Sequence, residues 1–455
     1  MKPLDLLNDN IKKIFLKYLF PSVGATMVTS IYILADTIMI GKGIGSNAVA
    51  GLNIILPLFS LIFGFGYLFG SGGAILMSVS LGRGDSKKAS QYFSTALFLI
   101  TIVSVVITFL LKIYFEPLVQ LLGVTDSTYN YVIEYGHILI FGVPFFIFSP
   151  FLQIFVRNDK AVKKAMFGVA TGGILNIILD YIFIFLFHWD MEGASLATVI
   201  GSFITFLILC SHFLTKNNTL RFSKRDISFC RIKDIISNGL STFFIEISSG
   251  IVIFAFNHQL LAYSGVAGVT VYSIISNSAA VVSSLNNGIA QAAQPIISRN
   301  FGAGNRSRVQ TTLRYGLATA FGAGALFMII GILFPATITN VFLNSTKEIY
   351  AMAKPAIQLY SFAFLTMAGN IFLNTYFQAV LCPKTALFIS LLRGFILNLA
   401  FLYFLPHVFG VNGIWITMPA AELITLLTAL ILFKKKASES FKMENVNESS
   451  IVKIV

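Results

Sequence analysis

The chain has 455 residues, of which 56% are apolar and only 11% charged, and its mean hydropathy is +0.82. Soluble globular domains are about 45–50% apolar and about 25% charged, so this composition excludes an ordinary soluble enzyme and a disordered protein. The net charge of +13 does not indicate nucleic-acid binding, because the basic residues are distributed as in a membrane protein. Three cysteines (Cys210, Cys230 and Cys382) are too few and too scattered for a disulfide framework or a thiolate metal site.

Twelve apolar stretches are long enough to span a membrane, since a helix needs about 20 apolar residues to cross a hydrocarbon layer of about 30 Å. They lie near residues 14–40, 48–80, 89–114, 129–156, 162–187, 192–213, 233–262, 268–298, 309–334, 348–380, 385–405 and 411–433. No small-residue cleavage site follows the first stretch, which we therefore interpret as a retained span and not a signal peptide. Pro21 lies inside it and predicts a bend there.

The basic residues predict the orientation of the spans. The N-terminus, the loops after the even-numbered spans up to the tenth, the start of the ninth span and the C-terminal tail carry 27 of the 32 Lys and Arg residues. The opposite side has only Lys42, Lys112, Lys347 and Lys354. By the positive-inside rule, we expect a multi-pass protein of the cell (plasma) membrane with both termini in the cytoplasm. We expect residues 437–455 to form a polar, mostly disordered tail.

The two halves of the chain repeat one pattern. LGRGDSKKA from Leu81 matches FGAGNRSRV from Phe301, so that Gly82 pairs with Gly302 at an offset of 220 residues. The alternative is convergence of unrelated glycine-rich turns. Because each half holds six spans, both face the same way, as in transporters with parallel repeats. We predict an all-α integral membrane fold of twelve transmembrane helices, in two pseudo-symmetric six-helix lobes around a central cleft. The expected units are an N-terminal lobe (1–213), a cytoplasmic inter-lobe linker (214–232), a C-terminal lobe (233–433) and a cytoplasmic tail (434–455).

Four acidic residues lie well inside the spans: Asp36, Asp180, Glu246 and Glu422. A charged carboxylate at the membrane centre costs roughly 2.5–3.5 kcal/mol on insertion scales. Arg393 is the one basic residue we place deep in the spans, so four ion pairs cannot form. Protonation is then the cheaper way to neutralise some of the acids. A carboxyl group whose charge can be switched is what a proton-coupled transporter requires.

Topology places a polar cluster in the N-terminal half. Asn176 precedes Asp180 by four residues, and Tyr32 precedes Asp36 by four, so each pair shares a helix face. Thr198, in the next span, lies at a depth similar to that of Asp180. These five residues are the predicted cation or proton site. The alternative for Asn176 and Thr198 is a role limited to hydrogen bonds between packed helices.

Polar residues of the second half give two further candidates. Glu246 is the matching acid of that half and a candidate second cation site, and the alternative is a protonated structural glutamate. Gln291, Gln294 and Asn286 cluster in the eighth span and could line a central cavity, although polar packing explains them equally well.

With these features the chain resembles the MATE family (multidrug and toxic compound extrusion transporters), and most closely its bacterial MepA-type branch, over residues 10–435. The resemblance rests on the twelve spans in two lobes, Pro21 fifteen residues before Asp36, VAGLNI from Val49, the paired glycine-rich loops, and Asn176-x-x-x-Asp180 with Thr198.

The resemblance implies roles for several of these residues. In proton-coupled members, the residues matching Asp36, Asn176, Asp180 and Thr198 form the N-lobe site, with a tyrosine matching Tyr32 beside it. Pro21 matches a proline at which the first span bends in some members. Glu246 matches a glutamate of the branch that binds a cation in the C-lobe, together with an aspartate of span 10. Here Asn370 occupies that position, which favours coupling in the N-lobe.

We therefore expect a cation-coupled antiporter that uses H⁺ or Na⁺ to export amphipathic, mostly cationic drugs and toxic organic compounds by alternating access. The expected partners are small organic cations and the lipid bilayer, not nucleic acid, and a monomer is expected to function. We expect no cofactor, and no metal beyond a possible Na⁺ at Asp36, Asn176, Asp180 and Thr198. The alternatives are a flippase for lipid-linked precursors, disfavoured because basic residues are scarce within the spans, and an intramembrane enzyme. The sequence has no HExxH or GxSxG motif, so we expect no enzyme.

Overall fold

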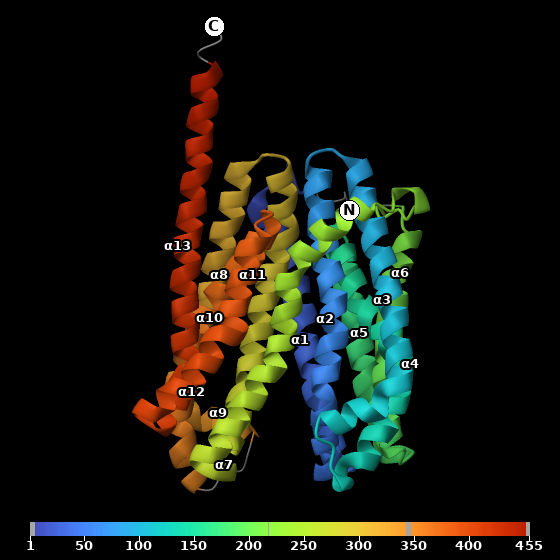
Figure 1. Ribbon diagram of the computed structural model, residues 1–455, viewed down its shortest axis with the longest axis vertical. Coiled ribbons are helices and arrows are strands. Elements are labelled where there is room, and N and C mark those ends of the chain that lie inside the picture. The colour runs from blue at the N-terminus through green and yellow to red at the C-terminus, as the bar shows by residue number, and fades with distance from the viewer. Residues whose placement is uncertain (1–4, 217, 343–346, 452–455) are drawn as a thin grey trace.

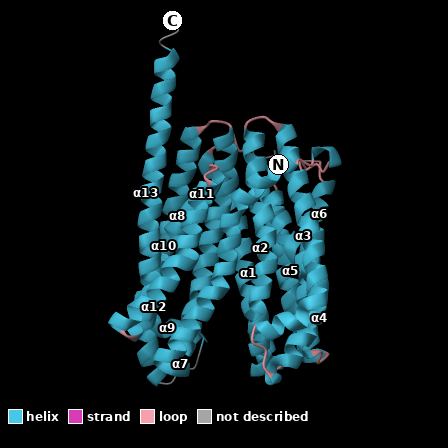
Figure 2. Ribbon diagram, viewed as in Figure 1, coloured by secondary structure: helices cyan, strands magenta, loops and turns pink. Residues whose placement is uncertain are grey.

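The computed structural model describes residues 5–216, 218–342 and 347–451, and these residues are helical almost throughout, with no strand among them (Figures 1 and 2). The α-helices are α1 (Ile11–Gly43), α2 (Ser46–Gly82), α3 (Ser86–Leu121), α4 (Asp126–Asn158), α5 (Val162–Asp180), α6 (Asp190–Cys210), α7 (Ile232–Gly302), α8 (Arg306–Leu333), α9 (Pro335–Phe342), α10 (Lys347–Ala379), α11 (Pro383–Leu391), α12 (Leu397–Phe409) and α13 (Val411–Ile451). Short π-helical segments follow α5 (Tyr181–Leu186) and α11 (Leu392–Ile396).

Within the described residues, eleven continuous helical stretches are long and apolar enough to cross a membrane. One of them, Phe229–Gly302, is 74 residues long, more than twice what a single span needs. Gly265 breaks it with a φ of 61° and a ψ of −156°, a backbone conformation that glycine adopts without steric cost. The stretch therefore supplies two spans, and the predicted all-α fold of twelve spans is confirmed.

The helices form two bundles, one built on α1–α6 and the other on α7–α13 (Figure 1). Each bundle has its own hydrophobic core: one is dominated by residues of α2, α3 and α4, the other by residues of α7, α8 and α10. Both chain termini lie at the same end of the molecule, together with the turns at residues 83–85 and 303–305 (Figure 1). We call this end the basic end.

The first helix of each lobe reaches into the core of the other lobe at the basic end. Phe15 and Tyr18 of α1 are buried in the core of the C-terminal lobe, whereas Ile235 of α7 is buried in that of the N-terminal lobe. Phe15 and Ile235 are 220 residues apart, which is the offset of the sequence repeat. The predicted boundaries therefore divide the helices along the chain, but at the basic end the first helix of each lobe packs into the core of the other.

Glycines allow the lobes to touch backbone to backbone. A Cβ on Gly82 of α2 would overlap the carbonyl oxygen of Arg299, and a Cβ on Gly302 would overlap that of Val79. Gly82 and Gly302 are one offset of 220 apart, and so are Val79 and Arg299. The two contacts are thus reciprocal, as a pseudo-two-fold repeat requires and as two unrelated glycine-rich turns would not produce.

The structure corrects the expected tail. Residues 437–451 continue α13, so the expectation of a mostly disordered segment was wrong for them, and residues 452–455 lie outside the described part. The physical reason is that no Gly or Pro follows Pro419 to end the helix, and Lys, Glu, Met and Ala favour helical backbone. The short helix α9 was also not predicted. It begins at Pro335, a residue well suited to the first position of a helix.

The reciprocal glycine contact predicts that two glycine-to-alanine substitutions differ strongly in their effect on stability. We expect Gly82→Ala to lower the unfolding temperature in detergent, with a loss of about 1–3 kcal/mol, because the new methyl group overlaps a backbone carbonyl that cannot move independently. The matched control is Gly322→Ala in α8, where a Cβ meets nothing within 4 Å, and it should leave stability unchanged or slightly higher. Equal melting temperatures for the two variants would contradict the contact.

Candidate functional site

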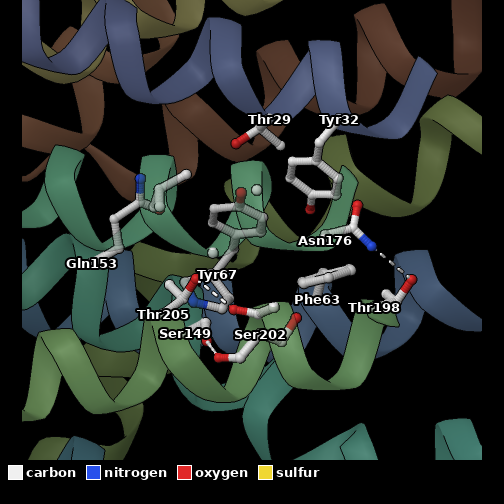
Figure 3. A pocket seen from close by; sticks show the side chains of 15 residues that line it. Thr29, Tyr32, Phe63, Tyr67, Ser149, Gln153, Asn176, Thr198, Ser202 and Thr205 are labelled. Atoms are coloured by element: carbon white, nitrogen blue, oxygen red, sulfur yellow. Dashed lines mark hydrogen bonds between the residues drawn. The ribbon is translucent and has the colours of Figure 1, made fainter. Parts of the chain in front are cut away.

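A cavity lies within the N-terminal lobe, among α1, α2, α4, α5 and α6 (Figure 3). It encloses about 570 Å³, part of which is open to the surroundings. Its lining is aromatic and polar without a charged side chain, and consists of Thr29, Tyr32, Phe63, Tyr67, Ser149, Pro150, Gln153, Val169, Gly172, Gly173, Asn176, Thr198, Gly201, Ser202 and Thr205. Aromatic faces combined with a few polar groups are typical of sites that bind amphipathic ligands, and the lining of this cavity has that character.

Glycines of α5 bring the walls of the cavity together. A Cβ on Gly173 would lie 2.9 Å from Cδ1 of Tyr32 in α1, so α1 and α5 touch closely at this level. On the other side of α5, a Cβ on Gly201 of α6 would lie 2.8 Å from the carbonyl oxygen of Gly172 and 3.1 Å from Cβ of Asn176. These approaches place Tyr32, Asn176 and Thr198 around one end of the cavity, as Figure 3 shows.

The structure brings the five predicted residues of the N-terminal lobe together. The Asn176 side chain donates to Oγ1 of Thr198 at 3.4 Å, and that hydroxyl donates to the carbonyl oxygen of Ala194 at 3.1 Å. Asp180 is fully buried, and its carboxyl group interacts with that of Asp36. Tyr32 interacts electrostatically with Asp36, and its phenol ring points into the cavity (Figure 3).

Several oxygen atoms of this cluster have no hydrogen-bond partner. They are Oδ1 of Asp36, Oδ1 and Oδ2 of Asp180, and Oδ1 of Asn176. Buried polar atoms are normally paired, so these oxygens are able to accept further hydrogen bonds or ligand bonds. Protons or a hard cation such as Na⁺ would satisfy carboxylate and amide oxygens. Within the described residues no group of three or more His, Cys, Asp or Glu side chains is placed to hold a metal ion.

Sequence reasoning missed three residues beside this cluster. Tyr67 and Gln153 line the cavity, and Tyr135 of α4 is 1% exposed and interacts with Asp36, Asp180 and Thr198. Gln153 carried a usable signal, because an amide in the middle of an apolar span is costly. The tyrosines carried none, since an aromatic residue in a span faces lipid, core or cavity equally well.

Glu246 interacts with two tyrosines of the N-terminal cavity. It belongs to the first span of α7, yet it interacts electrostatically with Tyr32 and Tyr67 of the other lobe. Its neighbour Phe243 explains the placement, since a Cβ on Gly64 of α2 would lie 3.1 Å from the Phe243 ring. The predicted acid of the second lobe thus faces the first.

Asn370, paired with Glu246 in the sequence-based expectation, instead bonds to Glu422. Its Nδ2 atom donates to Oε2 of Glu422 at 2.6 Å and to the carbonyl oxygen of the same residue at 2.7 Å. Nε of Arg393 donates to Oε1 of Glu422 at 2.6 Å, and Glu422 is fully buried. No hydrogen bond joins Glu246 and Asn370 in the described part of the chain, so a shared cation site of these two residues stays a prediction. Because Arg393 pairs with Glu422, it does not neutralise Asp36, Asp180 or Glu246.

The remaining candidates do not line this cavity. Gln291 and Gln294 bond to side chains of α4, as described below, and the Asn286 amide donates to the carbonyl oxygen of Val282 at 2.9 Å. Pro21 is buried within α1, which is one continuous helix from Ile11 to Gly43. Its role as a hinge stays a prediction.

The ion pair of Arg393 and Glu422 predicts that substitutions of its two members have non-additive effects on the free energy of unfolding. Arg393→Met should cost about 3–5 kcal/mol of unfolding free energy, because it leaves the Glu422 carboxylate buried without its counter-charge. The double variant Arg393→Met/Glu422→Leu removes both charges and should recover most of that loss. Chemical unfolding in detergent measures both, and a double variant as unstable as the sum of the two single ones would contradict the pairing.

Comparison with known proteins agrees with this architecture. The MatE family model matches residues 21–182 and 240–404, one segment in each lobe. The chain is 23% identical over 426 residues to the multidrug export protein MepA of Staphylococcus haemolyticus, covering 93% of each chain. It is 24% identical over 429 residues to the MepA protein of Staphylococcus saprophyticus, covering 93% of this chain and 94% of that one.

Solved structures have the same fold. A multidrug resistance MATE family transporter of the MOP superfamily, described in an outward-facing conformation, superimposes with a TM-score of 0.90. The alignment is 22% identical and covers 97% of this chain and 99% of that one. Since the family model spans most of both lobes, the chain is a multi-span membrane protein that belongs to the MATE (MatE) family.

Proposed function

We propose that this protein exports small amphipathic organic cations, including drugs, in exchange for H⁺ or Na⁺. The observation that carries the proposal is the pair Asp36 and Asp180: their carboxyl groups interact, and three of the four carboxyl oxygens have no hydrogen-bond partner, beside the cavity residues Tyr32 and Asn176. The relatives named as multidrug export proteins support the same class of cargo. The proposal is a transporter and not an enzyme.

The lining of the cavity favours a cationic, amphipathic cargo. Tyr32, Phe63 and Tyr67 offer aromatic faces, which attract organic cations by cation–π interactions of about 0.5–2 kcal/mol each. Two carboxyl groups interact electrostatically with Tyr32: that of Asp36 in the same lobe and that of Glu246 in the other. A cation between these groups would be paired, whereas an anion would meet only like charge.

Coupling follows if ion and cargo compete for the same carboxyl groups. An ion can shift a conformational equilibrium only through its different affinities for the two states. When a proton or Na⁺ neutralises Asp36 and Asp180, the cargo loses its counter-charge and is released. When the ion leaves in the opposite-facing state, the carboxylates regain their charge and the next cargo binds. Asn176 and Thr198 either bind the ion or hold the Asp180 side chain in position.

We further propose that the protein functions as a monomer in the plasma membrane, with the basic end in the cytoplasm. Lys and Arg residues concentrate at that end, in the pattern of the positive-inside rule. The cavity and the five residues beside it belong to one lobe of one chain, so a single chain contains all the groups that the proposed cycle requires.

The central test replaces the two carboxyl groups one at a time. Asp36→Asn and Asp180→Asn should each abolish uphill dye efflux from proteoliposomes, because an amide cannot alternate between charged and neutral forms. Efflux is measured with a pH gradient and a Na⁺ gradient imposed separately, which identifies the coupling ion.

The matched control is Glu116→Gln in α3, an exposed carboxyl group far along the chain from the site, and its efflux should equal that of the unmodified protein. Normal gradient-driven efflux in either aspartate variant would refute the assignment of the coupling site.

Orientation is tested by cysteine labelling in intact cells. In a background without the three native cysteines, Lys87→Cys and Ser307→Cys place thiols at the basic end, and Ser46→Cys and Val266→Cys place them at the other end. A membrane-impermeant maleimide added outside should label only the second pair. Labelling of the first pair alone would mean that the orientation is reversed.

A further inference from the structure

Four polar side chains join the two lobes near the basic end. They are Arg157 and Asn158 at the end of α4, and Gln291 and Gln294 in the second span of α7. Nη1 of Arg157 donates to Oε1 of Gln291 at 2.6 Å. Asn158 and Gln294 bond reciprocally, with each side-chain amide donating to the oxygen of the other at 3.0 and 3.1 Å. We call these four residues the latch.

The latch includes the buried guanidinium group of Arg157, which forms no ion pair with any described residue. Arg157 is 5% exposed, and no carboxylate of the described residues lies within ion-pair distance of it. Its Nε atom has no hydrogen-bond partner, so the bond to Gln291 is the hydrogen bond that its guanidinium makes in this state. A charged group bonded to a neutral partner typically contributes more than a neutral pair. Separation of the lobes here therefore exposes Arg157 to water and breaks a strong bond.

The latch is mechanically connected to the cavity through α4. Ser149 and Gln153 line the cavity, and Arg157 follows Gln153 by four residues, one turn further along the same face of the helix. A ligand that moves or rotates α4 at the cavity would thus move Arg157 against Gln291.

We propose that the latch holds the protein with its basic end closed, and that its opening is a required step when the cavity becomes accessible from that end. Arg157, Asn158, Gln291 and Gln294 are positioning residues: they set the balance between the two facing states and do not touch cargo. This proposal rests on the proposed function, because an exporter must open at both ends in turn. The alternative is a fixed contact that persists in both states and serves only stability.

The test measures the two states directly, without cargo or an ion gradient. In a background without native cysteines, one pair of spin labels at Lys87→Cys and Ser307→Cys reports the separation of the lobes at the basic end. A second pair at Ser46→Cys and Val266→Cys reports the opposite end. All four positions are exposed, and the members of each pair are 220 residues apart and so occupy equivalent places in the two lobes. Double electron–electron resonance in nanodiscs gives both distance distributions.

Two substitutions should move the balance in opposite directions. Gln291→Ala/Gln294→Ala removes the three inter-lobe bonds of the latch and leaves other inter-lobe bonds, such as Ser71–Thr242, in place. It should raise the ratio of basic-end-open to basic-end-closed molecules at least tenfold, equivalent to about 1.4 kcal/mol. Gln291→Glu gives Arg157 a counter-charge, and should lower that ratio and slow turnover. The matched control is Asn287→Ala on the same span, whose amide bonds only within its own helix, to Ser283, and it should change neither distance distribution.

The outcomes separate this inference from the proposed function. The latch is supported if the two variants shift the distance distributions in opposite directions. In the alanine variant, the basic-end distances should become longer and the distances at the other end shorter. Unchanged distributions with a lowered melting temperature would overturn it, since that is the signature of a merely structural contact. Shifted distributions in a protein that transports no dye would keep the latch and reject the exporter. A Gln291→Glu variant that fails to fold leaves the alanine variant and its control as the deciding comparison.

Discussion

The central constraint on this molecule is that hydrocarbon cannot accommodate an unpaired charge. In the C-terminal lobe, Arg393 and Asn370 satisfy Glu422 and convert a costly acid into a fixed structural element. In the N-terminal lobe, Asp36 and Asp180 face each other, with three of their four carboxyl oxygens left without a hydrogen bond. The same physical cost thus has a permanent solution in one lobe. In the other lobe, we propose, an exchangeable ion compensates it.

This asymmetry contrasts with the symmetry of the backbone. The repeat offset of 220 residues relates Phe15 to Ile235, Gly82 to Gly302 and Val79 to Arg299, all at contacts between the lobes. The same offset relates Glu422 to Ser202 and Asn370 to Pro150, two residues that line the N-terminal cavity. A buried ion pair therefore occupies, in one lobe, the position that a cavity occupies in the other. The side chains, not the arrangement of the helices, therefore distinguish the two lobes.

Much of this architecture is predictable from the sequence because it depends on one-dimensional patterns. Apolar stretches define twelve spans, and matching glycine turns define the repeat. The i, i+4 spacing of Asn176 and Asp180 then places a cluster that the structure brings together. What depends on the rotation of one helix against another was not predictable. The electrostatic interaction of Glu246 with tyrosines of the opposite lobe and the bonds of Gln291 and Gln294 to α4 are examples. Spacing along a helix gives a face, but the neighbour of that face follows from tertiary packing alone.

In the proposed cycle, ion and cargo compete for Asp36 and Asp180. Equilibrium binding of a cationic dye to the purified protein tests this competition most directly. Titrations across a range of pH and of Na⁺ concentrations, without a membrane or a gradient, isolate the competition from every other step. The account predicts that dye affinity falls as the concentration of the coupling ion rises, with about one ion displaced for each dye bound at the limiting slope. Dye affinity independent of both pH and Na⁺ would contradict it.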